Sequence, residues 1–139
     1  SDVCSSDLNR VSLEGSVLKP SMVISGKKCP QQASVQEVAE RTVRTLKRTV
    51  PAAVAGIAFL SGGQADEVAT AHLDAMNKLG NNPWPLSYSY GRALQQPSLK
   101  AWRGQSANVA AAQAALAHRG RMNSLASLGK YSAALEAQK

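Results

Sequence analysis

Hydrophobic and polar positions follow two patterns along the chain: short apolar runs, and longer segments with helical spacing. The apolar runs predict strands at residues 10–19, 53–60 and 84–90. Helical spacing predicts helices at residues 35–49, 65–79 and 107–128, with a broken helical region before the last of them. Strands joined by helix-length connections are typical of parallel βαβ units, so the pattern predicts an α/β fold.

Several residues mark where these elements begin or stop. Ser34 and Glu37 have the spacing of a capping box at the start of the first helix. Pro97 and Gly104 are expected to interrupt the helical region that follows the third strand. Residues 133–139 are expected to form a frayed tail.

Lys19 stands at the end of the first predicted strand. Pro20 cannot donate to a strand ladder, so pairing is expected to stop there. A lysine held at a strand end against apolar walls loses hydration, which favours the neutral amine. A neutral amine can attack a ketone or an aldehyde to form a Schiff base. The competing interpretation is an ordinary solvated lysine.

The other two predicted strands also end in residues suited to a ligand. Ser61-Gly62-Gly63 precedes a helix, where glycines let backbone N–H groups approach an anion and Ser61 adds a hydroxyl. The third strand ends in Ser89-Tyr90-Gly91-Arg92, in which Gly91 frees the backbone and Arg92 can bind phosphate in a bidentate manner. Because sites in parallel α/β proteins lie at the carboxyl ends of strands, the two turns together predict a phosphate site beside Lys19.

Composition narrows the possible partners. The 139 residues carry a net charge of +7, with 44% hydrophobic, 18% charged and 4% aromatic residues, as expected for one globular domain. A basic balance suits a phosphorylated substrate, whereas few aromatics and no basic–aromatic interleaving argue against nucleic acid. No apolar run is long enough to cross a membrane. Cys4 and Cys29 show no metal or CxxC pattern, which favours a reducing compartment.

The remaining candidate residues carry weaker signals. His72 lies within a predicted helix and His118 on the polar side of another, and both are expected to be surface residues, not ligands. Trp84 and Trp102 are expected to pack. No metal site is predicted.

Three longer segments carry a resemblance to a known family. They are LEGSVLKPSMV at 13–23, RTVPAAVAGIAFLSGGQ at 48–64 and PWPLSYSYGRALQ at 83–95. In this order they resemble class I fructose-bisphosphate aldolase. The resemblance covers residues 10–131, and it implies the last three βα units of a TIM (β/α)8 barrel, incomplete in this chain. Residues 1–9 are interpreted as a non-native leader and 132–139 as a tail.

The resemblance also implies a mechanism. Lys19 would form a Schiff base with the keto carbon of fructose 1,6-bisphosphate, and the iminium would accept electrons while the central carbon–carbon bond breaks. Glyceraldehyde 3-phosphate and then dihydroxyacetone phosphate would leave, without a metal or another cofactor. The set Ser61, Gly62, Gly63, Ser89, Gly91 and Arg92 would bind the phosphate. The family further implies a cytoplasmic enzyme of glycolysis and gluconeogenesis, with a plastid location still open, and a homotetrameric parent.

The chain departs from the family pattern in ways that leave alternatives open. The family's first five strands, with their carboxylates and further lysines, have no counterpart here, and the chain ends in Glu136-Ala137-Gln138-Lys139 instead of a tyrosine. We therefore expect this fragment to be inactive alone, because it lacks an acid–base partner. A non-enzymatic truncated remnant and a phosphate-binding module remain the competing hypotheses.

Overall fold

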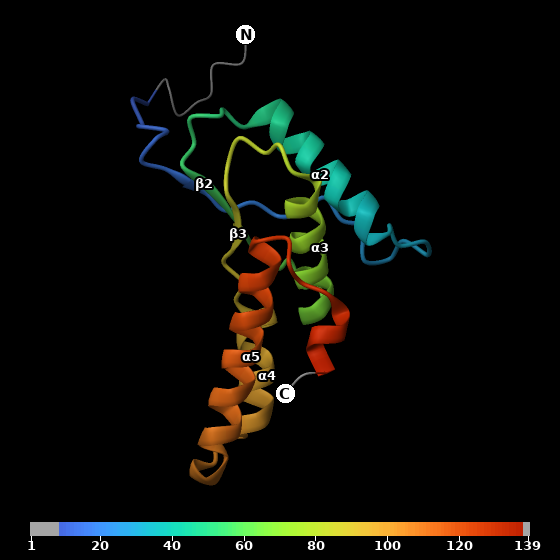
Figure 1. Cartoon of the computed structure of the whole chain (residues 1–139), viewed down its shortest axis with the longest axis vertical. Coiled ribbons are helices and arrows are strands. Elements are labelled where there is room, and N and C mark those ends of the chain that lie inside the picture. Colours follow the sequence, from blue (N-terminus) through green and yellow to red (C-terminus); the bar gives the residue numbers. More distant parts are fainter. Residues whose placement is uncertain (1–8, 138–139) are drawn as a thin grey trace.

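The computed structural model describes residues 9–137 of the chain. Strands and helices alternate as the hydrophobic pattern predicts (Figure 1). The elements are β1 (Val17–Leu18), α2 (Val35–Thr49), β2 (Gly56–Phe59), α3 (Asp66–Leu79), β3 (Leu86–Tyr88), α4 (Arg92–Trp102), the 3-10 turn η1 (Ser106–Asn108), α5 (Val109–Ser127) and the 3-10 segment η2 (Ala133–Ala137). The expected leader at residues 1–9 lies, apart from Asn9, outside the described residues.

The three strands form one parallel sheet in the order β1-β2-β3. In β2, Ile57 and Phe59 are almost completely buried, in one hydrophobic cluster with residues of α2 and α3. These two helices lie on one side of the sheet (Figure 1). Ala58 lies between Ile57 and Phe59 and so points to the opposite face, where its partner Ser87 is exposed. Among the described elements, helices therefore cover one face of the sheet.

The strands are shorter than the hydrophobic pattern predicts. The first was expected at residues 10–19, but only Val17 and Leu18 pair as a strand, because a turn at Glu14 and Gly15 precedes them. The second and third begin later than expected, because a turn follows Pro51 and a bend lies at residues 83–84. Apolar composition therefore marks the right segments but overestimates the paired length.

The strand ladder of β1 ends at Leu18, and one further backbone hydrogen bond reaches Pro20. Leu60 N donates to the carbonyl oxygen of Pro20 at 3.0 Å, and this bond continues the register in which Leu18 pairs with Ile57. Proline lacks an N–H donor but keeps its acceptor. The prediction that strand pairing does not pass Pro20 agrees with the end of β1 at Leu18, although the carbonyl oxygen of Pro20 still accepts one hydrogen bond.

The first two helices match their predicted limits to within one residue. The side chain of Ser34 caps α2 by accepting a hydrogen bond from Glu37 N at 3.2 Å. The Glu37 carboxylate pairs with Arg41 at 2.7 Å, and not with the backbone at the cap. On α3 the inward-facing residues Leu73 and Met76 are fully buried.

Helix α4 continues through Pro97 from Arg92 to Trp102, contrary to the predicted interruption. Packing against α5 offsets the backbone hydrogen bond that proline removes: the Ser98 hydroxyl donates to the carbonyl oxygen of Ala112 at 2.8 Å. The helix ends at Arg103 and Gly104, both with positive φ. The predicted stop at Gly104 is confirmed.

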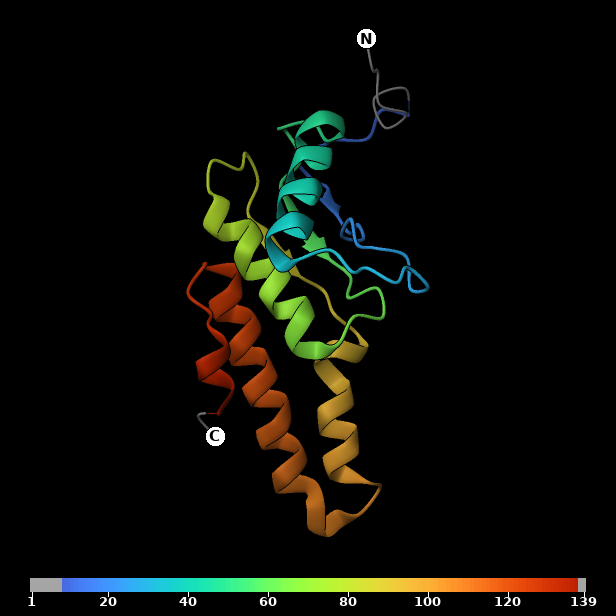
Figure 2. The same cartoon turned by 90° about the vertical axis from the view of Figure 1, so that its right-hand side faces the viewer.

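Helices α4 and α5 form an antiparallel hairpin that extends beyond the sheet (Figures 1 and 2). Gly129, with φ +65°, ends α5, and Lys130 N donates to the Leu125 carbonyl at 2.9 Å. Trp84 is buried as predicted, whereas Trp102 remains 43% exposed near the far end of α4. The two helices therefore pack along the length of the hairpin, and its tip is exposed to solvent.

The C-terminal segment is not frayed over its described part. Residues 133–137 form η2, and Glu136 accepts hydrogen bonds from Arg119 Nη1 at 2.7 Å, His118 Nε2 at 2.8 Å and Tyr131 Oη at 3.0 Å. Burial raises the pKa of this carboxyl, but these hydrogen bonds outweigh burial and hold the pKa below its ordinary value. The segment is therefore anchored to α5 by a charged contact that hydrophobic periodicity does not reveal.

Candidate functional site

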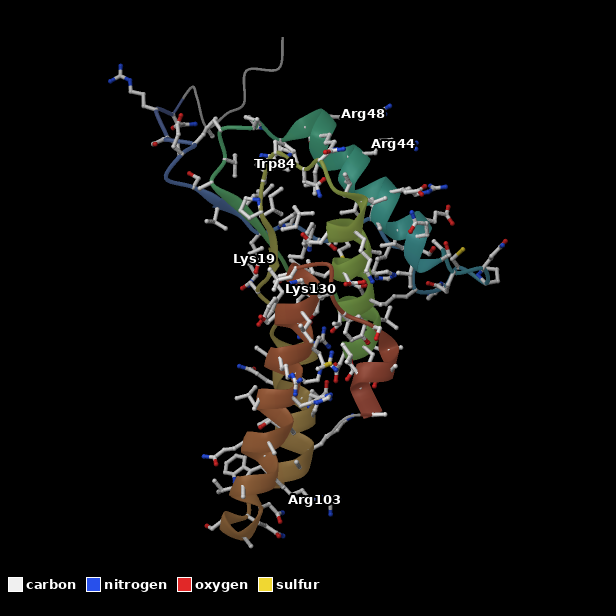
Figure 3. The ribbon with its side chains drawn as sticks, in the orientation of Figure 1. Lys19, Arg44, Arg48, Trp84, Arg103 and Lys130 are labelled. Carbon is white, nitrogen blue, oxygen red and sulfur yellow. The ribbon has the colours of Figure 1, made fainter. Side chains whose placement is uncertain are left out.

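Lys19 lies directly after β1 at the carboxyl end of the sheet (Figure 3). The continued register places it opposite Ala58, and alternation then puts it on the sheet face that the described helices leave open. Lys19 is exposed, so the expected apolar wall around its amine is absent from the described part of the chain. Arg44 and Arg48 on α2 and Arg103 at the hairpin tip lie apart from it (Figure 3).

Ser61, Gly62 and Gly63 form a turn between β2 and α3, here called the anion turn. Gly62 and Gly63 have φ values of +59° and +78°, a conformation that favours glycine. Ser61 is buried, and both glycines are exposed. The glycines are therefore required by backbone conformation, and they leave the turn open to an approaching ligand.

The anion turn lies beside residues from both neighbouring strand-to-helix loops. A Cβ atom built on Gly63 would lie 3.4 Å from Lys27 Nζ and 3.6 Å from Arg92 Nη2. A Cβ on Gly62 would lie 3.4 Å from Ser21 Oγ. The structure thus brings the anion turn and Arg92 together, and adds Lys27 and Ser21 from the loop after β1.

Gln64 and His72 form a hydrogen-bonded chain that ends at the anion turn. The sequence analysis did not assign either residue to the site. Gln64 Nε2 donates to the Ser61 carbonyl at 2.8 Å, which leaves Gln64 Oε1 to accept from His72 Nδ1 at 2.5 Å. His72 is buried, not on the surface as expected, and burial lowers the pKa of its imidazole. A glutamine directly after two glycines was the available signal in the sequence.

The Ser89–Arg92 corner is fixed by Tyr90. The Tyr90 hydroxyl donates to the carbonyl oxygen of Ala69 on α3 at 2.8 Å, and burial raises the pKa of this phenol. Ser89 N pairs with Phe59 O at 2.8 Å, so its exposed side chain stands at the carboxyl end of the sheet. Gly91 has a φ of −87° and a ψ of −88°, and a Cβ there would meet nothing within 4 Å.

The site is basic. Neither Lys27 nor Arg92 pairs with an acidic side chain among residues 9–137, and α4 begins at Arg92 with no acidic residue in its first turn. The same residues include no group of three or more side chains suited to holding a metal ion. Within the described chain no helix is long and apolar enough to cross a membrane.

The anion turn together with Lys27 and Arg92 suits an anion held by backbone N–H groups and two cations.

The fold and this edge of the sheet define a segment of a parallel α/β protein whose strand-end loops carry the predicted site residues. Residues 4–139 match the family model described as "Glycolytic: Fructose-bisphosphate aldolase class-I". The chain therefore belongs to the class I fructose-bisphosphate aldolase family, as the resemblance predicted. Proteins of this family are TIM barrels, and the three-stranded parallel sheet is consistent with part of such a barrel.

Individual relatives agree with this membership. The chain is 60% identical over 122 residues to "Probable fructose-bisphosphate aldolase class 1" of Xanthomonas axonopodis pv. citri, covering 87% of this chain and 36% of the relative. It is 54% identical over 123 residues to a fructose-bisphosphate aldolase of Dictyostelium discoideum, covering 88% and 34%. The chain thus spans about a third of the length of these relatives.

A solved structure gives the same result for the fold. The fructose-bisphosphate aldolase of Plasmodium falciparum, in complex with TRAP and a small-molecule inhibitor, superposes with a TM-score of 0.87 at 51% identity. The match covers 89% of this chain and 36% of that one.

Proposed function

We propose that residues 10–131 are the last three βα units of a class I aldolase barrel that cleaves fructose 1,6-bisphosphate. The observation that carries this proposal is the meeting of the anion turn with Arg92 at the carboxyl end of the sheet, in a chain of this family. Lys19 lies at the same end of the sheet, on the face that the described helices do not cover. In a closed barrel this face would line the interior.

In the proposed reaction the Lys19 amine attacks the keto carbon of the sugar, and loss of water gives an iminium ion. A base elsewhere in the closed barrel takes the proton of the C4 hydroxyl, the carbon–carbon bond breaks with its electron pair passing to the iminium, and glyceraldehyde 3-phosphate leaves. Protonation and hydrolysis then release dihydroxyacetone phosphate and the free lysine. The anion turn, with Ser89, Gly91 and Arg92, would hold the phosphate next to the ketone and orient it for attack.

The chain alone supplies a nucleophile and one anion site. No carboxylate among residues 9–137 pairs with Lys19, and cleavage needs a group that moves protons. We therefore propose that the isolated chain binds phosphate esters but does not cleave the sugar. A homotetrameric parent in the cytoplasm belongs to the same proposal.

The test joins residues 10–139 to the preceding two thirds of the Xanthomonas relative. We expect the chimeric chain to cleave fructose 1,6-bisphosphate and to form an adduct with dihydroxyacetone phosphate that borohydride traps, as detected by mass spectrometry. Lys19→Ala should lower kcat/KM by at least about a thousandfold and abolish the adduct, whereas Lys28→Ala, in an exposed loop, should do neither. A folded chimera without cleavage would reject the aldolase proposal, and an adduct that persists in Lys19→Ala would point to another nucleophile.

A further inference from the structure

The loop after β1 contributes a side chain to the anion turn that the phosphate-binding set does not include. Lys27 comes from the β1–α2 connection, Gly63 from the β2–α3 connection and Arg92 from the start of α4. The Lys27 ammonium and the Arg92 guanidinium approach the same point above Gly63, at 3.4 Å and 3.6 Å from its built Cβ position. Their separation therefore cannot exceed the sum of these two distances.

Two cations so close repel each other unless an anion lies between them. Neither has an acidic partner within the described chain. A tetrahedral phosphate presents three oxygens and can accept hydrogen bonds from both groups at once. The pair of unpartnered cations is thus arranged for a ligand that carries two negative charges.

The Lys27 loop is held in place by its own hydrogen bonds. Cys29 N donates to the Gly26 carbonyl at 2.9 Å, which closes a turn with Lys27 at its second position. Gln32 Nε2 donates to both ends of this turn, to Gly26 O at 3.2 Å and to Cys29 O at 2.8 Å. Ala33 N donates to Ser25 Oγ at 2.9 Å. The turn therefore directs Lys27 toward the anion turn, although the lysine itself is exposed.

We infer that Lys27 is a specificity-determining residue of this site, a second cation beside Arg92 that selects a doubly charged phosphate monoester over a singly charged anion. The inference rests on the proposed phosphate-binding function and adds a ligand from the first strand-to-helix loop. Lys28, the next residue, makes no comparable approach to the anion turn, so it provides a matched control.

The test titrates the full chain with methyl phosphate at pH 7.5 and follows the backbone amides of Gly62 and Gly63 by NMR, with Gly104 as a remote reference. Methyl phosphate has no carbonyl, so Lys19 chemistry does not contribute. Lys27→Met should weaken binding about threefold to tenfold, Lys27→Arg should restore most of it, and Lys28→Met should match the wild type.

Methyl sulfate, used as a second ligand, tests whether the site selects for two negative charges. Methyl sulfate has the same shape but carries one negative charge, so the ratio of the two affinities measures selection for the dianion. This ratio should fall in Lys27→Met and stay at the wild-type value in Lys28→Met. Loss of fold cannot produce that pattern, because it would weaken both ligands alike.

Arg92→Met distinguishes a failure of the Lys27 role from a failure of the phosphate site. If Arg92→Met weakens methyl phosphate binding while Lys27→Met behaves like Lys28→Met, the role of Lys27 is rejected and the phosphate site stands. If Arg92→Met binds like the wild type, or if methyl phosphate gives no saturable shift at Gly62 and Gly63, the phosphate site itself is rejected.

Discussion

His72 links the interior of α3 to the anion turn through Gln64, so its protonation state bears on both stability and the site. The unfolded chain takes up a proton at His72 near the ordinary pKa of 6.5, whereas burial lowers the pKa of this group in the folded protein. Below about pH 6.5 the unfolded state therefore binds more protons than the folded state. Stability contributed by the neutral imidazole is lost as pH falls from that value through the folded-state pKa.

We predict that the free energy of unfolding in urea decreases between pH 7.5 and pH 5, and that His72→Gln makes this decrease shallower. Glu136, whose pKa is lowered from 4.5, contributes its own loss at lower pH, so the two effects occur in different windows. An unchanged slope in His72→Gln would show that the imidazole does not carry the effect.

At the scale of single residues, sequence reasoning succeeded where the backbone sets the requirement. Gly62 and Gly63 follow a buried strand, and both have the positive φ that favours glycine. It failed for His72, which follows the buried Ala69 by three positions and precedes the buried Met76 by four, because the polarity of the imidazole was weighed above its helical position. Lys27 was not predicted as a site residue, since its distance from Gly63 depends on the path of the 35 residues between them.

At the scale of elements, α3 and α5 are joined by a buried polar contact. The Thr70 hydroxyl donates to Asn123 Oδ1 at 2.7 Å and accepts a hydrogen bond from Arg119 Nη2. All three side chains are almost completely buried. Polar groups removed from water need such partners, so this contact fixes how the two helices pack.

Thr70→Val should lower the free energy of unfolding by about 1–3 kcal/mol, because it leaves the buried Oδ1 of Asn123 without a donor and removes one of the two hydrogen bonds that Arg119 Nη2 makes. Urea denaturation followed by circular dichroism measures the change. Thr45→Val is the control: its hydroxyl donates to the Arg41 carbonyl on the exposed side of α2, and its effect should stay within about 0.5 kcal/mol. Equal losses in the two variants would contradict a special role for the buried contact.

Sequence pattern located each helix, but it could not foresee the contacts that decide its length. Pro97 has the local signature of a helix break, yet α4 continues because α5 packs beside it. Residues 133–137 have no amphipathic pattern, yet Glu136 anchors them to Arg119. Both outcomes depend on partners distant in the sequence.

At the scale of the whole molecule, the sheet has an exposed edge. Val17 is 64% exposed and Leu18 is 37% exposed on β1, the first strand in the sheet order. An apolar edge strand with unpaired backbone groups is a template for another chain. The relatives, about three times as long, contain additional residues that could cover such an edge.

We predict that the isolated chain associates as its concentration rises, and that Val17→Lys increases the monomer fraction measured by light scattering. A lysine at an edge opposes strand pairing between molecules. Val109→Lys removes a valine that is 42% exposed on α5, away from the sheet, and should have little effect. A wild-type chain that stays monomeric at all concentrations and unfolds cooperatively would contradict this prediction.

The parallel order of the sheet was predictable because each strand is followed by a helix long enough to cross over. The uncovered face of the sheet was not predictable from the strand pattern, because the same apolar pattern suits a sheet covered on both faces.

Lys27, Gly63 and Arg92 belong to three separate loops, and only the native topology assembles them. An unfolded chain offers no comparable binding place, so by mass action any phosphate ester captured here would draw the folding equilibrium toward the native state. Under the proposed function, a cell rich in phosphate esters would thereby help to keep this chain folded.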